Sequence, residues 1–219
     1  MTFARLLQRI PGWGEFLIMV GVCWGWFAFR SASMAVGMAA HPAFDDAYLL
    51  GLIGHELVAG AVAFLLLRAR GWSHRDFPIQ ITWTGSGAGL LLLLLDFLLN
   101  WAAVDIGRGL GGTVEPLTEL SQSISTTFPV AVLASIVNGG FEELFLVGYV
   151  FRALERHDLP LVLGVSAFLR MVAHVYQGPA GALSLLCMGV FFGLVYARYR
   201  QLWPLMLAHI GADVLVLAR

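Results

Sequence analysis

Seven long apolar runs, separated by short polar, glycine- or proline-containing segments, follow one another along the chain. Each run comes close to the about 20 apolar residues that a helix needs to cross a bilayer. The pattern therefore predicts a single all-α, polytopic transmembrane helical bundle over residues 1–219. Its expected spans are residues 13–37, 48–67, 86–104, 127–151, 159–176, 179–197 and 201–218.

Composition supports a membrane protein. Hydrophobic residues make up 59% of the chain and charged residues 12%, whereas soluble domains average about 45–50% and about 25%. So little charge cannot solvate a compact chain of this length, and we expect the lipid bilayer to surround it. The net charge of −1 provides no basic field for nucleic acid, so we expect no nucleic-acid partner.

The arginines fall mainly on one side of the predicted spans. With the N-terminus inside, nine of them lie in cytoplasmic segments and two, Arg108 and Arg219, in outer segments. Basic residues accumulate on the cytoplasmic side of membrane proteins. All 13 basic residues are arginine, a bias typical of GC-rich bacterial genomes. We therefore expect a multi-pass protein of the bacterial inner membrane with a cytoplasmic N-terminus.

The first run allows a second interpretation, and the longest connector has a predicted side of the membrane. The first run has a basic start and the small-residue segment "SASMA", which are also typical of a cleaved signal peptide. The longest connector, residues 105–126, is polar and is predicted to lie outside.

Polar side chains inside apolar spans are candidates for function, because burying them in a bilayer is costly. Spacing sorts them. Glu142 and Glu143 are adjacent and point about 100° apart on a helix, so only one can face a given pocket squarely. Three of the predicted helices each carry two polar residues four positions apart, which places both on the same helix face. These pairs are Asn138 with Glu142, Arg170 with His174, and His209 with Asp213.

A glutamate and two histidines from separate helices suggest two hydrolytic chemistries. Glu142, His174 and His209 can hold a divalent metal such as zinc, with one position left for water. Alternatively, a glutamate can act as general base on water while imidazoles stabilise an oxyanion. The competing interpretation is structural, with these groups neutralising one another in a transporter or scaffold bundle.

Other buried polar residues are weaker candidates. His55 and Glu56 lack the second histidine of the zinc-protease pattern HExxH. Asp96 and Asn100, four residues apart, are expected to pair locally or to line the same cavity. Arg30 is expected to pair with an acid or to extend toward the membrane surface.

Three stretches, "EELFLVGYVFRAL", "FLRMVAHVYQG" and "LWPLMLAHIGADVLVL", resemble the motifs of the CPBP intramembrane proteases. This family, also called Abi, includes CAAX proteases and bacteriocin-processing or self-immunity proteins. The resemblance covers residues 127–216, which would form the motif-bearing catalytic core. It implies a membrane-embedded polar cavity that holds five catalytic residues: Glu142, Glu143, His174, His209 and Asp213.

The resemblance also implies a function. Glu142 would activate water, Glu143 would orient it, and His174 and His209 would bind metal or stabilise the oxyanion. The substrate would be a peptide or membrane protein. The alternative is a non-catalytic scaffold or self-immunity protein that binds a peptide or protein partner through the same cavity. A small-solute transporter is disfavoured because the sequence has no inverted repeat.

The first two motifs depart from the family pattern at one position each. Val147 stands where the family has arginine in Glu-Glu-x-x-x-Arg, and Arg170 stands where it has phenylalanine in Phe-x-x-x-His. Because an unpaired guanidinium at this depth is expensive, we expect Arg170 to pair with Glu142 or Glu143. Arg170 would then replace the missing motif arginine and, with Asn138, orient the catalytic groups.

A straight fifth helix raises a geometric problem. At about 1.5 Å of rise per residue, it would place His174 roughly two turns farther from the cytoplasmic side than Glu142 and His209. A shared site therefore requires that this helix starts deeper, tilts strongly, or has other boundaries than residues 159–176.

Overall fold

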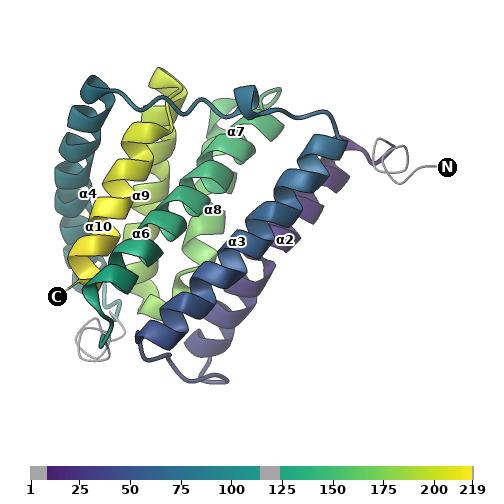
Figure 1. The fold of residues 1–219 in the computed structure, drawn as a ribbon. Helices are drawn as coiled ribbons and strands as arrows, with labels where there is room; N and C mark the ends of the chain where they lie inside the picture. Colours follow the sequence, from purple (N-terminus) through teal and green to yellow (C-terminus); the bar gives the residue numbers. More distant parts are fainter. Residues whose placement is uncertain (1–8, 114–123, 219) are drawn as a thin grey trace.

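A computed structural model describes residues 9–113 and 124–218 of the chain. In these residues, helices occupy all seven predicted spans and run alternately in opposite directions (Figure 1). The helix order is α2 (Gly12–Ala35), α3 (Asp46–Ala69), α4 (Trp83–Gly109), α6 (Phe128–Glu142) continued by η2 (Glu143–Tyr149) and α7 (Val150–Ala153), α8 (Leu159–Val172), α9 (Gly178–Tyr199) and α10 (Trp203–Leu217). Two short 3₁₀ turns, η1 (His74–Asp76) and η3 (Val175–Gln177), lie in connectors.

The predicted all-α bundle is confirmed, with a correction to two spans. Five helical segments are long and apolar enough to cross a membrane. The other two are shorter, because α8 has 14 residues and α10 has 15. The predicted span 159–176 is too long, since the helix ends at Val172 and the chain turns into η3. Most of the predicted outer connector, residues 114–123, lies outside the described residues.

The fourth span is not a uniform α-helix. Pro129 lies in its first turn, where the missing backbone N–H has no cost, and α6 runs from Phe128 to Glu142. The next seven residues form the π-helix η2 before α7 completes the span. Short π segments inside α-helices often occur at functional sites, and this one begins at Glu143, the second glutamate of the pair.

Small residues let the helices approach closely. At Gly139, a methyl group would lie 2.9 Å from the Ile210 side chain and 3.0 Å from its backbone nitrogen, so α6 and α10 meet at glycine. Gly189 of α9 likewise lies against the backbone of Ala167 in α8. Close backbone approach through small residues is a common way for membrane helices to pack. These contacts join α6 to α10 and α8 to α9.

The buried core lies around the fourth span. Phe141, Phe145 and Leu146 are buried within the main hydrophobic cluster, and the Trp24 ring of α2 stacks on Phe141 with centroids 5.3 Å apart. Helix α10 packs against both α4 and α6, α9 against α4 and α8, and α3 against α6. The helices thus surround the glutamate pair.

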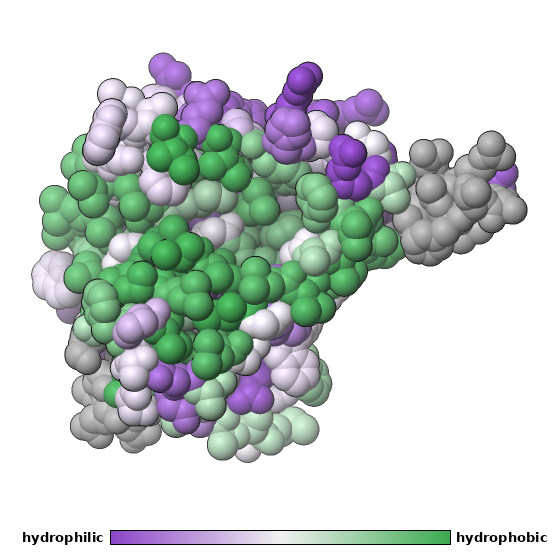
Figure 2. All heavy atoms as spheres, viewed as in Figure 1, coloured by the Kyte–Doolittle hydropathy of each residue, from purple (hydrophilic) through white to green (hydrophobic). Residues whose placement is uncertain are grey.

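A broad apolar surface covers the middle of the molecule. Figure 2 shows hydrophobic residues across the centre of one face, with hydrophilic residues toward the top and bottom. Large side chains such as Leu17, Phe29 and Val58 are each 66–67% exposed. Such exposure is unfavourable in water but expected against lipid tails. The protein is a multi-pass membrane protein.

The two ends of the bundle differ in charge. The end at which α2 begins and α3 ends, called here the arginine end, carries eight described arginines: Arg9, Arg68, Arg70, Arg75, Arg152, Arg156, Arg198 and Arg200. In the described part of the chain, the opposite end has Arg108 at the last turn of α4. Arg5 and Arg219, which belong to the predicted nine-to-two bias, lie outside the described residues.

Candidate active site

The two glutamates lie at the junction of α6 and the π-helix, and they face different surroundings. Glu142 is 8% exposed and lines a cavity, whereas Glu143 is fully buried and does not line it. The adjacency therefore presents one carboxylate to the cavity and directs the other into the protein. This division of the pair follows from the 100° step between neighbouring helical residues.

Arg170 of α8 joins the pair. Its side chain is fully buried; Nη1 lies 3.2 Å from Glu142 Oε2 and Nη2 lies 2.7 Å from Glu143 Oε1. The sequence hypothesis expected a single glutamate partner and left the other unpaired, whereas the guanidinium contacts both. The Phe192 ring lies 5.8 Å from the guanidinium carbon, and Val147, at the motif-arginine position, is buried.

His174 lies in the turn that follows α8. Its Nδ1 lies 2.8 Å from the backbone oxygen of Arg170. Because a carbonyl oxygen only accepts, Nδ1 carries the hydrogen, and in the neutral ring Nε2 has the lone pair. Nε2 lies 3.9 Å from Glu142 Oε1. His174 thus lies at the level of Glu142, and the predicted helix boundary at residue 176 is corrected, since α8 ends at Val172 and His174 belongs to the following turn.

His209 of α10 lies between two carboxylates. Its Nδ1 lies 2.7 Å from Glu143 Oε1, so Nδ1 donates to that buried carboxylate. Its Nε2 lies 3.7 Å from Asp213 Oδ1, one helical turn away. Asn138 Nδ2 donates to Asp213 Oδ2 at 2.8 Å. Each group is thus held by another helix or turn, which restricts its rotamers.

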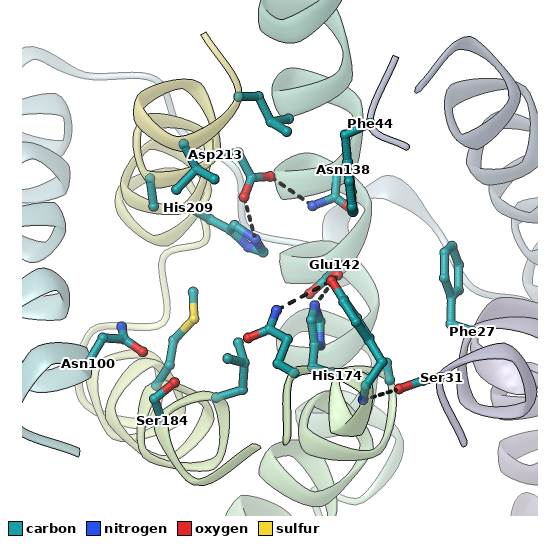
Figure 3. Close-up of a pocket in the computed structure, with 18 of the residues that line it drawn as sticks. Phe27, Ser31, Phe44, Asn100, Asn138, Glu142, His174, Ser184, His209 and Asp213 are labelled. Atoms are coloured by element: carbon teal, nitrogen blue, oxygen red, sulfur yellow. Dashed lines mark hydrogen bonds and ion pairs between the residues drawn. The ribbon is translucent and has the colours of Figure 1, made fainter. Parts of the chain in front are cut away.

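A cavity of about 710 Å³ connects these groups. Glu142, His174, His209, Asp213 and Asn138 all line it, and Figure 3 shows their polar atoms turned toward its centre. Its lining continues to residues of the end opposite the arginines: Pro42, Phe44, Asp105, Arg108, Ile124 and Leu217. The cavity therefore runs from the glutamate pair toward the opposite end of the bundle.

Several supporting contacts were not anticipated from the sequence. The Ser166 hydroxyl donates to the backbone oxygen of Leu146 inside the π-helix at 2.7 Å. Ser166 lies one turn before Arg170, so the shared helix face was a usable signal. The backbone N–H of Tyr176 donates to Ser31 Oγ of α2 at 3.1 Å, which fastens the turn after His174. No pattern within α2 indicated that contact.

The weaker candidates divide between cavity and core. Asp96 and Asn100 line the cavity, and the Asn100 amide donates to the backbone oxygen of Asp96, so the expectation of a local pair or a shared cavity is confirmed. Arg30 also lines the cavity. His55 and Glu56 do not, and His55 packs edge-on against Phe27 with ring centroids 5.2 Å apart.

The proposed metal ligands do not form a metal site as they are arranged. No three His, Cys, Asp or Glu side chains in the described ranges are placed to hold an ion together. Glu142 Oε2 already contacts Arg170, and His209 Nδ1 already contacts Glu143. These donors do not fit a three-ligand zinc site without rearrangement.

Comparison with known proteins supports the motifs. Residues 124–215 match a family described as type II CAAX prenyl endopeptidase Rce1-like. Searches of curated proteins and of solved structures give no match. The matched segment contains the three motif-bearing helices and their site residues. The resemblance recognised from the motifs is confirmed over this segment, since residues 124–215 match the model of the Rce1-like proteins, which are part of the CPBP intramembrane protease family.

Proposed function

We propose that the protein is an intramembrane peptidase that hydrolyses a peptide bond with water activated by Glu142. The observation that carries this proposal is the division of the glutamate pair. One carboxylate faces a cavity beside a histidine, and the other is buried and bound to Arg170 and His209. The family match gives independent support, since it names endopeptidases.

The water site lies between Glu142 and His174. Their 3.9 Å separation is too long for a direct hydrogen bond and suits a water that contacts both. Arg170 holds Glu142 Oε2, which leaves Oε1 directed at this position. Oε1 would take a proton from the water as the water oxygen attacks the carbonyl carbon of the substrate.

The remaining groups suit the later steps. In its doubly protonated form His209 would donate from Nε2 to the developing oxyanion, while Glu143 fixes the ring through Nδ1. Asp213, held by Asn138, would keep the imidazole oriented. When the C–N bond breaks, the proton on Glu142 would pass to the leaving nitrogen, giving a carboxyl and an amino product.

A peptide-library cleavage assay on the purified protein tests this function. We expect cleavage within apolar peptides, with new termini identified by mass spectrometry. A parallel assay with a chelator tests the zinc hypothesis, since loss of activity that added zinc restores would favour metal-assisted hydrolysis. Peptide binding without any cleavage would favour the scaffold or self-immunity alternative.

The charge difference between the ends also supports an orientation. Placing the arginine end in the cytoplasm of a bacterial inner membrane follows the positive-inside rule. The N-terminus would then be cytoplasmic, and the cavity would extend toward the outer side. A substrate would therefore enter from the outer leaflet or from outside the cell.

Reporter fusions give a direct test of this orientation. We expect a fusion in the connector between α3 and α4 to report the cytoplasm, and a fusion after α10 to report the outside. If the fusion after α10 reports the cytoplasm, the number of membrane crossings is not odd. If the fusion in the connector between α3 and α4 reports the outside, the proposed orientation is reversed.

A further inference from the structure

A second set of polar groups lines the cavity, outside the three family motifs. Asp96 and Asn100 come from α4, and Ser184 comes from α9. Figure 3 shows Asn100 and Ser184 on one side of the pocket, with Glu142 and His174 between them and Ser31 on the other side. The α4 residues precede the segment that matches the family, so the match assigns them no role.

The central member is a buried carboxylate with an unsatisfied oxygen. Asp96 is 4% exposed, and its Oδ1 has no hydrogen-bond partner among the described residues. None of the ion pairs found in residues 9–113 and 124–218 involves Asp96. His209 and Arg170 act on Asp96 through space, while their own direct contacts are with the two glutamates. A buried carboxylate without a partner is costly and requires an explanation.

The other two polar groups of this wall offer acceptor atoms. Asn100 Nδ2 donates one of its two hydrogens to the Asp96 backbone oxygen at 2.9 Å, and the amide oxygen of Asn100 stays available. The Ser184 hydroxyl donates its hydrogen to the backbone oxygen of Gly181 at 2.8 Å, which leaves its lone pairs. The wall therefore presents three acceptor groups, namely a carboxylate, an amide oxygen and a hydroxyl oxygen, beside one remaining N–H of Asn100. Its complement is a cation that carries several N–H donors.

We infer that Asp96, Asn100 and Ser184 form a subsite for an ammonium or guanidinium group of the substrate. This inference rests on the proposed function, because the subsite shares its cavity with Glu142. It deepens that function by naming a substrate class: apolar peptides that carry one positive charge near the cleaved bond. The ammonium of a lysine side chain and that of a free N-terminus share this chemistry, and peptide design separates them.

Peptide binding tests the subsite without relying on cleavage. The protein carries Glu142→Gln, and the probes are fluorescent apolar octapeptides with one lysine at each position in turn. Matched peptides carry acetyl-lysine instead, and each is made with a free or an acetylated N-terminus. We expect the charged group to tighten binding at least about tenfold at its best position, as for hydrogen bonds to charged groups. Adding Asp96→Asn should remove that preference and leave binding of the acetyl-lysine peptides unchanged.

Asp105→Asn is the matched control variant. Asp105 is also an α4 carboxylate that lines the cavity, but its side chain is exposed. We expect it to keep most of the preference for charge. Equal affinity for lysine and acetyl-lysine peptides at every position, or no binding of any probe, would overturn the inference. If Asp96→Asn and Asp105→Asn lose the preference for charged peptides equally, the inference is also overturned, because the preference would then come from the overall negative charge of the cavity and not from Asp96. Charge-selective binding combined with no cleavage by the wild-type protein would instead reject the peptidase and keep the subsite.

Discussion

Replacing Glu142 with glutamine is expected to lower kcat/KM for peptide cleavage by about a thousandfold, within the range that general-base catalysis contributes. Glutamine has nearly the same shape, and its amide oxygen can still accept from Arg170. It cannot take a proton from the water between Oε1 and His174 Nε2. Because Arg170 keeps its shorter contact with Glu143, the variant should still fold and should lose less of its thermal unfolding temperature than a change at Glu143.

Glu143→Gln serves as the comparison for this experiment. Glu143 is fully buried and contacts both Arg170 and His209, so the change removes the one carboxylate that these two side chains share. Breaking one side of a buried ion pair costs about 3–5 kcal/mol. We therefore expect Glu143→Gln to lower the unfolding temperature as well as the activity. Retention of more than a tenth of wild-type kcat/KM in Glu142→Gln would contradict its role as the base.

The sequence was sufficient to predict features that the bilayer dictates. A span needs a long apolar run, so seven runs predicted seven helices, and the high cost of a buried guanidinium predicted that Arg170 would meet the glutamates. Helical spacing brought His209 and Asp213 onto one face, where the structure has them. These predictions hold because one strong physical constraint acts on each of them.

Features that depend on tertiary packing were not predictable in this way. The π-helix at Glu143–Tyr149 lies in a segment that is apolar on nearly every face, so hydrophobic periodicity gives no signal of a changed helical step. The position of His174 depends on where α8 stops, and boundaries carry little sequence signal. Asp96 and Asn100 were expected to pair locally or to line the same cavity, and they do both, but the spacing gave no sign that the bond would go to the backbone oxygen one turn earlier.

The departure from the family pattern at Val147 and Arg170 leads to the second prediction. Arg170 reaches both glutamates from α8, whereas the family's motif arginine lies on the same helix as the glutamates. A guanidinium supplied from α8 can hold Glu142 Oε2 and leave Oε1 free for water. Arg170 is therefore proposed to be a positioning residue that compensates for the valine at 147.

Arg170→Leu should reduce cleavage by about a hundredfold or more, since a misplacement of about 1 Å at a reacting group can have that effect. It should also destabilise the fold, because two adjacent carboxylates would be buried without their cation. Arg170→Lys should recover part of the stability but less of the activity, because one ammonium cannot reproduce two directed contacts.

The decisive variant combines Val147→Arg with Arg170→Phe, which recreates the family pattern. If Arg170 compensates for Val147, the double variant should cleave at least about tenfold faster than Arg170→Leu and should unfold at a higher temperature. Val147→Arg alone is the control, and it should be impaired because a second guanidinium would enter a filled, buried position. Wild-type activity in Arg170→Leu would show that the charge is dispensable. A double variant that is folded but no better than Arg170→Leu would show that the guanidinium acts from α8 alone, in which case the two positions are not interchangeable.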